Sequence, residues 1–565
     1  MWEYSIKTAF STVYDVSFEV SGPMNIIHKT VSVAIALLIV CASGGCGDPG
    51  RRAKDLTDSV DLGPTIGSLA NVLAPEPAAV EGYGVVGGLN RTGSADCPPQ
   101  IRAYLKRHIQ KQLAQTGDPA RLNIEQYLGS PETAVVLVEG VIPEIPSKNQ
   151  YFDVRVTALS GTQTTSLEGG VLFNTELKRP GSFGISTDVL ADAEGPIFTD
   201  KNNANLMDPK IGYVLAGGKV LSEYRIILVL QEPDFRMANR IRNRLNGRFG
   251  NSTARAALPG RIEVLMPDQY KEQKQRFVSL IKAIYLTQEP EATVERIRTL
   301  VKRLADSQDP YESEIGLEAI GNQSLGGLSV LLNSADERVR LHAARCMLNL
   351  GSDAGLAALR QIAMDARSPN RLEALKAITL GARRPEAASI ARKLLRDNDF
   401  HITLAAYHHL RQIDDIAITQ EFIGRNFYLV QTAQTNRQAI YASRSGQPQI
   451  VLFGAPLQCH PNIFVESADG EITMNAPAGR SYVTIMRKHP KRPGVVARLN
   501  SSFDLGDIIK TLCEEPPKED DKGRAGLGVS YAQAIVLLKR MCDKGAVDAE
   551  FHTGDLPKIS LNIKK

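Results

Sequence analysis

Cysteine, histidine and long apolar runs are scarce in this sequence of 565 residues. Its seven cysteines and nine histidines are too few and too scattered for a disulfide framework or an array of metal sites. No apolar run reaches the roughly 20 residues that a helix needs to span a membrane. The sequence therefore excludes a polytopic membrane protein.

An excess of one charge is also lacking. Lys and Arg number 66 and Asp and Glu number 62, which gives a net charge of +4. Because a dedicated nucleic-acid binder carries a stronger basic excess, we expect no nucleic-acid partner. Hydrophobic residues make up 43% of the chain and charged residues 23%, as in ordinary globular proteins. The length allows about three or four domains.

The sequence motifs of common enzymes are missing as well. The chain contains no H-E-x-x-H, no G-x-S-x-G and no P-loop. Residues 82–87 fit the dinucleotide pattern G-x-G-x-x-G, but such a site needs a preceding strand and an acidic residue about 20 positions later. An Ala-Pro-Glu-Pro segment precedes this block instead, and residues 105–107 offer no carboxylate. We therefore expect no nucleotide site here.

Two short pairs contain metal-ligating residue types. His408–His409 and Cys459–His460 lack further partners at metal-ligand spacing. Surface or core roles are therefore expected for all four residues. We predict no catalytic residue, no cofactor and no metal, and hence that the protein is not an enzyme.

The first 46 residues are typical of an export signal. From Met24 the chain has a short basic segment, then apolar residues 31–40, then small residues up to Cys46. The small residues before Cys46 resemble a bacterial lipobox, which predicts lipidation at Cys46 and a mature chain that begins there. Ordinary cleavage near residues 42–45 is the alternative. Because a signal should start the chain, Met24 is a possible true start.

The region from 47 to 300 alternates strand and helix patterns. Residues 134–138 form an apolar run and residues 151–159 alternate apolar and polar side chains, so both are predicted strands. Residues 181–209 are rich in Gly, Asp and Asn and are predicted to be loop. A β-α-β unit follows, with strands at 224–230 and 261–266, and we expect it to be a split βαβ unit.

The helix of that unit has two different faces. Its apolar face is formed by Phe235, Ala238, Ile241, Leu245 and Phe249. Pro233 and Asp234 are suited to open this helix. Its other face contains Arg236, Arg240, Arg244 and Arg248. We expect a solvated arginine face, with a subunit contact as the alternative.

Residues 301–417 contain a repeat. RLHAA at 340–344 recurs as RLEAL at 371–375 and as ITLAA at 402–406, 31 residues apart in both cases. Two helices per repeat indicate a HEAT-like α-solenoid, with an irregular helical bundle as the alternative. The equivalent residues Ala343, Ala374 and Ala405 are then expected to face inward.

The last part of the chain is predicted to be rich in strands. We expect a β-rich domain at 418–513, a linker at 514–528, and a helix with a strand-like tail at 529–565. The basic run at 488–498 is expected to be a solvated loop. Contact with an anionic envelope polymer or a lipid headgroup is the alternative for that run.

Several blocks of the first half resemble the flagellar P-ring protein family. They occur in the family's order over about residues 50–290. The blocks are RAKDL at 52–56, VEGYGVVGGLNRTG at 80–93, YFDVRVTAL at 151–159, SLEGGVL at 166–172, TELK at 175–178, the β-α segment at 224–249 and TARA at 253–256. The sequence is thus identified as P-ring-like over residues 47–300, and it is predicted to be a multidomain α+β protein.

The resemblance implies a structural role in the periplasm. P-ring proteins self-associate into a ring around the flagellar rod at the peptidoglycan layer and act with the outer-membrane L-ring. The implied partners are further copies of the chain, rod and L-ring proteins, and the peptidoglycan or envelope surface. No catalytic residues follow from the family. Because the resemblance ends near residue 300, the alternative is a lipid-anchored envelope scaffold that binds a protein partner through its helical repeats.

Overall fold

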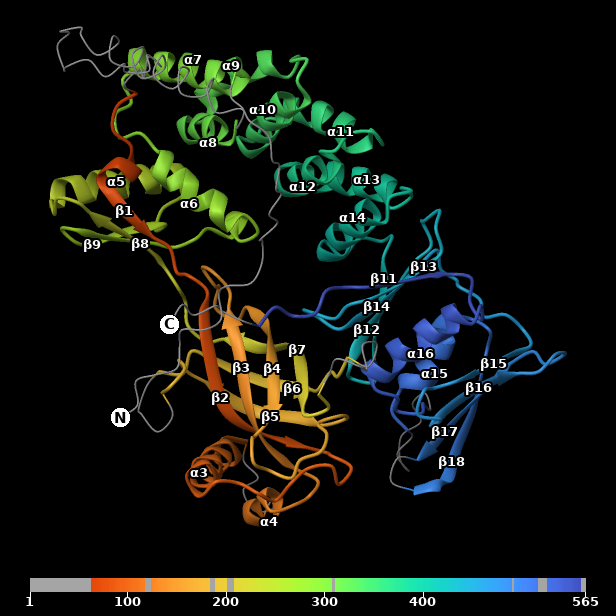
Figure 1. The fold of residues 1–565 in the computed structure, drawn as a ribbon. Coiled ribbons are helices and arrows are strands. Elements are labelled where there is room, and N and C mark those ends of the chain that lie inside the picture. Colours follow the sequence, from red (N-terminus) through yellow and green to blue (C-terminus); the bar gives the residue numbers. More distant parts are fainter. Residues whose placement is uncertain are drawn as a thin grey trace, which may run out of the picture. The chain divides into compact units, whose positions relative to one another are not determined.

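A computed structural model describes residues 62–116, 123–182, 188–200, 208–306, 310–489, 492–516 and 526–559. Within these residues the protein has several sheets and many helices, so the predicted multidomain α+β class is confirmed (Figure 1). Met24, Cys46 and the first motif block lie outside the described residues. Among the helices of the described ranges, none is long and apolar enough to cross a membrane.

A small α/β module comes first in the described chain. Its antiparallel sheet has the order β1-β8-β10-β9. The bounds are β1 Ala70–Leu73, β8 Ile226–Leu230, β10 Arg261–Val264 and β9 Ala254–Leu258. Helix α5 (Phe235–Phe249) starts at Asp234, whose carboxylate accepts hydrogen bonds from the backbone N–H groups of Arg236 and Met237. Helices α2 (Ile66–Leu69) and α6 (Lys274–Ala283) pack on each other in the same core.

Two details of this module differ from the prediction. The strand that follows α5 is β9, and β10 lies between β8 and β9, so residues 261–266 are not the first strand after the helix. The short run Ala254–Leu258 was missed because only its first residue is buried. On α5, Ala238, Ile241 and Leu245 are buried as predicted, but Phe235 is 57% exposed because it opens the helix beside the exposed cap.

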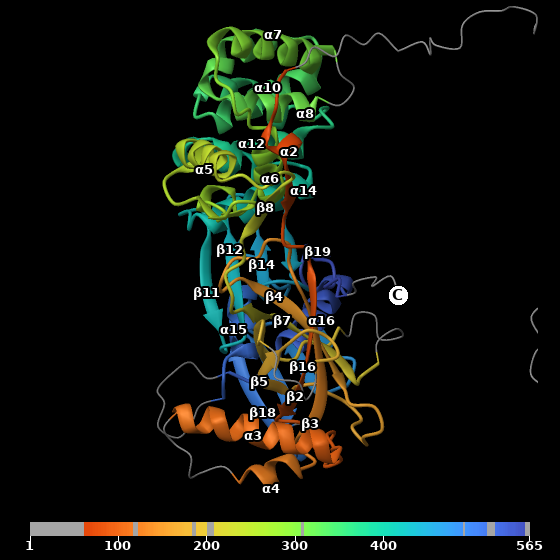
Figure 2. The same cartoon turned by 90° about the vertical axis from the view of Figure 1, so that its left-hand side faces the viewer.

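Six strands close into a barrel between β1 and β8 in the sequence. They follow the order β2-β3-β4-β7-β6-β5 around the barrel (Figure 1). The bounds are β2 Ala78–Gly87, β3 Ala134–Ile142, β4 Tyr151–Ala158, β5 Val171–Leu177, β6 Ala191–Pro196 and β7 Ile211–Val220. Helices α3 (Pro99–Thr116) and α4 (Ile124–Leu128) cover one end, where they pack near Val85 and Val135 (Figure 2).

The predicted loop at 181–209 is wrong where β6 forms. Strand β6 pairs with β5 and β7, and its residues Ala191 and Ala193 are fully buried in the barrel core. Two small alanines fill this interior position, and the flanking acidic residues and glycine hide the alternation from a sequence pattern. Residues 183–187 and 201–207 lie outside the described residues.

Eight helices follow one another in the described part of the central region. Their bounds are α7 Pro290–Asp306, α8 Tyr311–Ile320, α9 Leu325–Leu331, α10 Glu337–Asn349, α11 Leu356–Met364, α12 Arg371–Gly381, α13 Arg384–Leu394 and α14 Phe400–Gln412. Helices α8, α10, α12 and α14 each pack on the next one (Figures 1 and 2). Ala343 and Ala374 are buried as predicted, whereas Ala405 is only partly buried.

Two sheets and two helices share the last core. The first sheet has the order β11-β12-β14-β13-β19 and the second β15-β16-β17-β18. The bounds are β11 Thr419–Ile423, β12 Phe427–Thr432, β13 Ala439–Ala442, β14 Gln449–Phe453, β15 Ile463–Glu466, β16 Ile472–Ala476, β17 Val483–His489, β18 Arg492–Ser501, α15 Leu505–Cys513, α16 Tyr531–Asp543 and β19 Glu550–Thr553. Strand β19 pairs in parallel with β13, so the predicted strand-like tail belongs to the first sheet.

The predicted loop over the basic run is wrong. Of the described residues of this run, 488–489 belong to β17 and 492–498 to β18; these strands pair antiparallel, and Lys488 lies opposite Val496. Gly494, Val495, Val496 and Arg498 are exposed on β18, which is an edge strand of its sheet.

The glycine block at 82–87 lies in β2, where the barrel closes against β5. Glu81 and Lys178 exchange two backbone hydrogen bonds of 2.8 and 2.9 Å, and Val86 pairs with Leu172. A Cβ atom on Gly82 would lie 2.3 Å from the carbonyl oxygen of Glu176, and one on Gly84 2.4 Å from Thr175 Oγ1. The glycines therefore allow a close approach of two backbones, which explains the pattern without a nucleotide.

We predict that Gly82→Ala destabilises the barrel by about 1–3 kcal/mol, because its methyl group meets backbone that must move. Gly247→Ala is the matched control, because nothing lies within 4 Å of its added Cβ and alanine favours the helix by up to about 1 kcal/mol. Thermal unfolding of both variants beside the parent measures the difference. Equal melting temperatures for the two variants would contradict the role of Gly82.

Candidate functional site

The two metal-like pairs of the sequence have different surroundings. His409 Nε2 is buried without a hydrogen-bond partner among the described residues, and burial lowers the pKa of His408 and of His409. Burial raises the pKa of the Cys459 thiol to about 12, while His460 Nε2 lies 2.8 Å from Asp548 Oδ2. Within the described ranges, no three His, Cys, Asp or Glu side chains are grouped to hold a metal ion.

The arginine face of α5 packs against its own chain. Arg244 Nε donates to the backbone oxygen of Tyr285 at 3.2 Å, and Arg240 Nη2 donates to that of Leu286 at 3.3 Å. Arg248 Nη2 donates to the backbone oxygen of Glu318 at 2.9 Å. The expected solvated face is therefore wrong for Arg244 and Arg248, which are half-buried because the chain after α6 and helix α8 cover them.

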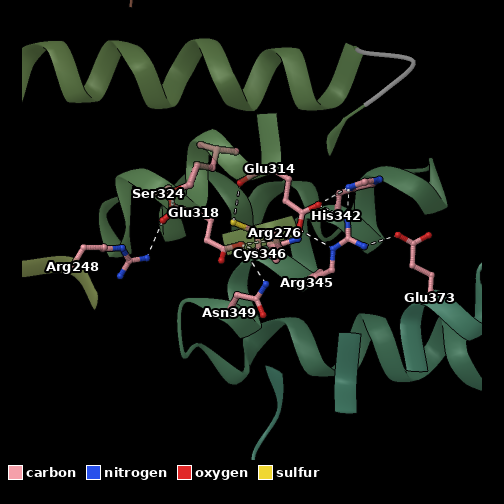
Figure 3. A network of polar contacts seen from close by, with 11 residues as sticks. Arg248, Arg276, Glu314, Glu318, Ser324, His342, Arg345, Cys346, Asn349 and Glu373 are labelled. Atoms are coloured by element: carbon pink, nitrogen blue, oxygen red, sulfur yellow. Dashed lines mark hydrogen bonds and ion pairs between the residues drawn. The ribbon is translucent and has the colours of Figure 1, made fainter. Parts of the chain in front are cut away.

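The most buried charged cluster lies where α6, α8 and α10 meet (Figure 3). Arg276 of α6 is 7% exposed, and the side chains of Glu314 and Glu318 of α8 are fully buried. Arg276 Nη2 donates to Glu314 Oε1 at 2.5 Å, and Arg276 Nε donates to Glu318 Oε2 at 3.0 Å. One guanidinium thus bridges two carboxylates. We call these three residues and their partners on α10 the buried network.

Helix α10 completes the buried network from the other side of Glu314. Arg345 Nε donates to Glu314 Oε1 at 2.8 Å, and His342 Nδ1 lies 2.6 Å from Glu314 Oε2. Asn349 Nδ2 donates to Glu318 Oε2 at 3.2 Å. Arg345 also contacts Glu373 of α12, with Nη1 2.5 Å from Oε1 (Figure 3). Together with Glu373, the buried network therefore connects four helices that pack in succession, namely α6, α8, α10 and α12.

The two buried carboxylates respond oppositely to this environment. Burial opposes ionisation of Glu314, but the charge of Arg276 and hydrogen bonds from Arg345 and His342 outweigh it and hold the pKa of Glu314 below its usual range. Burial raises the pKa of Glu318, and Arg276 offsets this only partly. Glu318 Oε1 is buried and has no hydrogen-bond partner among the described residues. Glu314 is therefore the fully satisfied anion of the pair.

Sequence patterns did not identify the buried network. Glu314 and Glu318 lie four residues apart on one face of α8, among residues that are buried all round. Two carboxylates at this spacing inside an apolar helix are a usable signal, because buried acids require buried cations. Nothing local identifies Arg276 as that cation, since it lies 38 residues before Glu314.

Residues 65–301 match the model of the flagellar P-ring protein family. The chain is also 29% identical over 245 residues to the flagellar P-ring protein of Hydrogenovibrio crunogenus, covering 40% of this chain and 63% of that one. It is 27% identical over 276 residues to the protein of the same name from Pseudothermotoga lettingae, covering 46% and 74%. The protein of that name from Nitrosomonas europaea is 30% identical over 235 residues, covering 38% and 59%.

These matches confirm the predicted P-ring resemblance for the first half of the chain. The chain spans 63% of the length of the first of these relatives, which is less than two thirds. The matched region contains the α/β module, the barrel and Arg276, whereas Glu314, Glu318 and α10 follow it. The flagellar P-ring protein is a structural component of the basal body and not an enzyme. The buried network therefore connects Arg276, which lies in the matched region, to helices α8 and α10, which lie outside it.

We predict that Arg276→Met destabilises the protein by about 3–5 kcal/mol, because it leaves two buried carboxylates without their shared cation. Arg298→Met is the control, since that side chain is 73% exposed and its ion pair with Glu295 lies on the surface, where such pairs contribute about 0–1 kcal/mol. Urea unfolding followed by circular dichroism compares the two.

A triple variant tests the cause of that loss. Arg276→Met combined with Glu314→Gln and Glu318→Gln removes the buried negative charges and is expected to be more stable than Arg276→Met alone. A midpoint for Arg276→Met equal to that of Arg298→Met would show that the buried network does not stabilise the fold.

Proposed function

We propose that the protein is a P-ring-like structural subunit of the bacterial flagellar basal body. It assembles with copies of itself into a ring around the rod in the periplasm. The match of residues 65–301 to the flagellar P-ring family carries this proposal. The barrel and the α/β module both lie in that matched region, so the ring-forming surfaces are expected there. The proposed partners are further copies of the chain, rod and L-ring proteins, and the peptidoglycan or envelope surface.

The regions after residue 301 are proposed additions to that subunit. We infer that α8, α10, α12 and α14, which pack in succession, form one side of a HEAT-like array. The β-rich region follows it. An envelope lipoprotein that holds a protein partner through this array is the second candidate function. It is favoured by the position of all the helices from α8 onward outside the family match.

The ring proposal predicts the behaviour of a deletion strain. Cells without this chain are expected to lose swimming and to lack a complete ring in isolated basal bodies. The reason is that the rod would then have no ring around it. Electron microscopy of the basal bodies, with mass spectrometry of their proteins, measures this. Expression of the full chain should restore both. Normal swimming, with the chain absent from parental basal bodies, would refute the ring role and leave the scaffold.

Lipidation at Cys46 is a separate proposal. A lipid-modified Cys46 would hold the chain at a membrane, since an acyl chain contributes about 0.8 kcal/mol per buried methylene group. Cys46→Ala is therefore expected to move the chain from the membrane fraction to the soluble periplasmic fraction. Cys41→Ala is the matched control and should leave fractionation unchanged. Membrane retention of Cys46→Ala equal to that of the parent would exclude lipidation.

A further inference from the structure

The hairpin of β17 and β18 extends beyond the hydrophobic core of its domain. Near its base, Ile485 is fully buried and lies opposite Leu499, which is half-buried and packs against the same core. Ala497 lies two residues nearer the turn, on the same face of β18, and is exposed. All residues from 494 to 498 are exposed, on both faces of the strand. We call Lys488 and residues 494–498 the hairpin end (β17 and β18 in Figure 1).

Apolar and cationic side chains lie together at the hairpin end. Val495 and Val496 are each 51% exposed. Lys488 lies directly opposite Val496 across the two strands, and Arg498 follows Val496 by two residues, so all three share one face. Lys488 and Arg498 are both exposed. One face of the hairpin end therefore presents an apolar side chain between two positive charges.

Acidic side chains of the same sheet lie on the other side of β17. Among the described residues they are Glu466 of β15, and Asp469 and Glu471 of the turn between β15 and β16. Strand β17 adjoins this turn, since the backbone N–H of Lys488 donates to the backbone oxygen of Glu471 at 2.8 Å. Strand β18 lies one strand farther away, at about 10 Å from β16, near the distance over which salt screens exposed charges. Arg498 is therefore the less compensated of the two cations.

The edge of β18 is unsuited to pairing with a further strand. Pro493 has no backbone N–H group to donate, and Arg498 places a charge on the edge strand. Proteins use proline and charged residues on edge strands to prevent the addition of another strand. A partner that is contacted through side chains, and not through strand pairing, is therefore favoured.

We propose that the hairpin end binds the surface of an anionic lipid membrane. Val495 and Val496 enter the boundary between headgroups and acyl chains. Lys488 and Arg498 have long apolar stems that let their charges reach the lipid phosphates. A lipid surface accepts both kinds of side chain, whereas a soluble anionic polymer attracts only the charges. This inference goes beyond the ring role and does not depend on it.

Co-sedimentation of the full purified chain with vesicles tests the site. One set of vesicles contains equal parts of phosphatidylglycerol and phosphatidylcholine, and the reference set contains phosphatidylcholine alone. Every sample carries Cys46→Ala, so that the acyl anchor proposed above adds nothing to binding. We expect binding to the anionic vesicles that weakens as salt is added, because salt screens exposed charges.

A charge variant identifies the contact with the lipid phosphates. Arg498→Gln is expected to weaken binding to the anionic vesicles about fivefold, because one Lys or Arg near such a surface contributes about that factor. Arg338→Gln is the matched control, since Arg338 is also exposed but lies on α10.

The apolar contact has its own variant. Val495→Thr combined with Val496→Thr keeps β-branched side chains, which suit a strand, and removes apolar surface. Its binding is expected to fall severalfold, while its salt dependence stays that of the parent. Val330→Thr is the control, because Val330 is 70% exposed on α9.

The proposal would be overturned by equal binding to the two sets of vesicles or by equal losses for Arg498→Gln and Arg338→Gln. It would also be overturned if the combined Val495→Thr and Val496→Thr variant bound as well as Val330→Thr. Complete release from the vesicles by polyglutamate, at a charge concentration equal to that of the lipid, would identify a soluble anionic polymer as the ligand instead. Binding is measured on the isolated chain, so failure of ring assembly in cells does not affect the outcome.

Discussion

The position of Arg276 between Glu314 and Glu318 is the constraint on which the middle of the molecule depends. Two carboxylates inside an apolar helix can be buried only if a cation is buried with them. Arg276 is that cation, and it belongs to α6, so α8 cannot pack elsewhere without leaving charges unpaired. Arg345 extends the same requirement to α10 and, through Glu373, to α12. The helical array is thereby joined to the α/β module by specific polar contacts as well as by apolar packing.

The contacts between α6 and α8 cross the end of the family match. The match ends at residue 301, inside α7, which runs from Pro290 to Asp306 and packs on α8. The sequence similarity thus ends within a continuous helix. Ile315 and Ala319 of α8 share the hydrophobic core of the α/β module. Helix α8 is therefore packed on the P-ring-like region through a shared apolar core.

Sequence patterns predicted those elements that are determined by residues close together in the sequence. The alternation along Tyr151–Ala158, the cap at Asp234 and the repeat at Ala343 and Ala374 depend on neighbours in sequence. Closure of the barrel depends on Gly82 meeting Glu176, and the buried network on Arg276 meeting Glu314. Such long-range pairs leave no periodic trace. The glycine block therefore resembled a nucleotide motif, and the arginines of α5 resembled a solvated face.

Strongly shifted pKa values often indicate an active site, but here they have a structural cause. Burial and Arg276 act on Glu314 and Glu318, and burial also raises the pKa of Cys346 well above its usual value. The side chains of Glu314, Glu318 and Cys346 are fully buried. At the edge of this charged cluster, His342 and Arg345 line a small polar pocket. The centre of the cluster is already occupied by its own countercharges, so these shifted pKa values reflect burial and ion pairing within the fold.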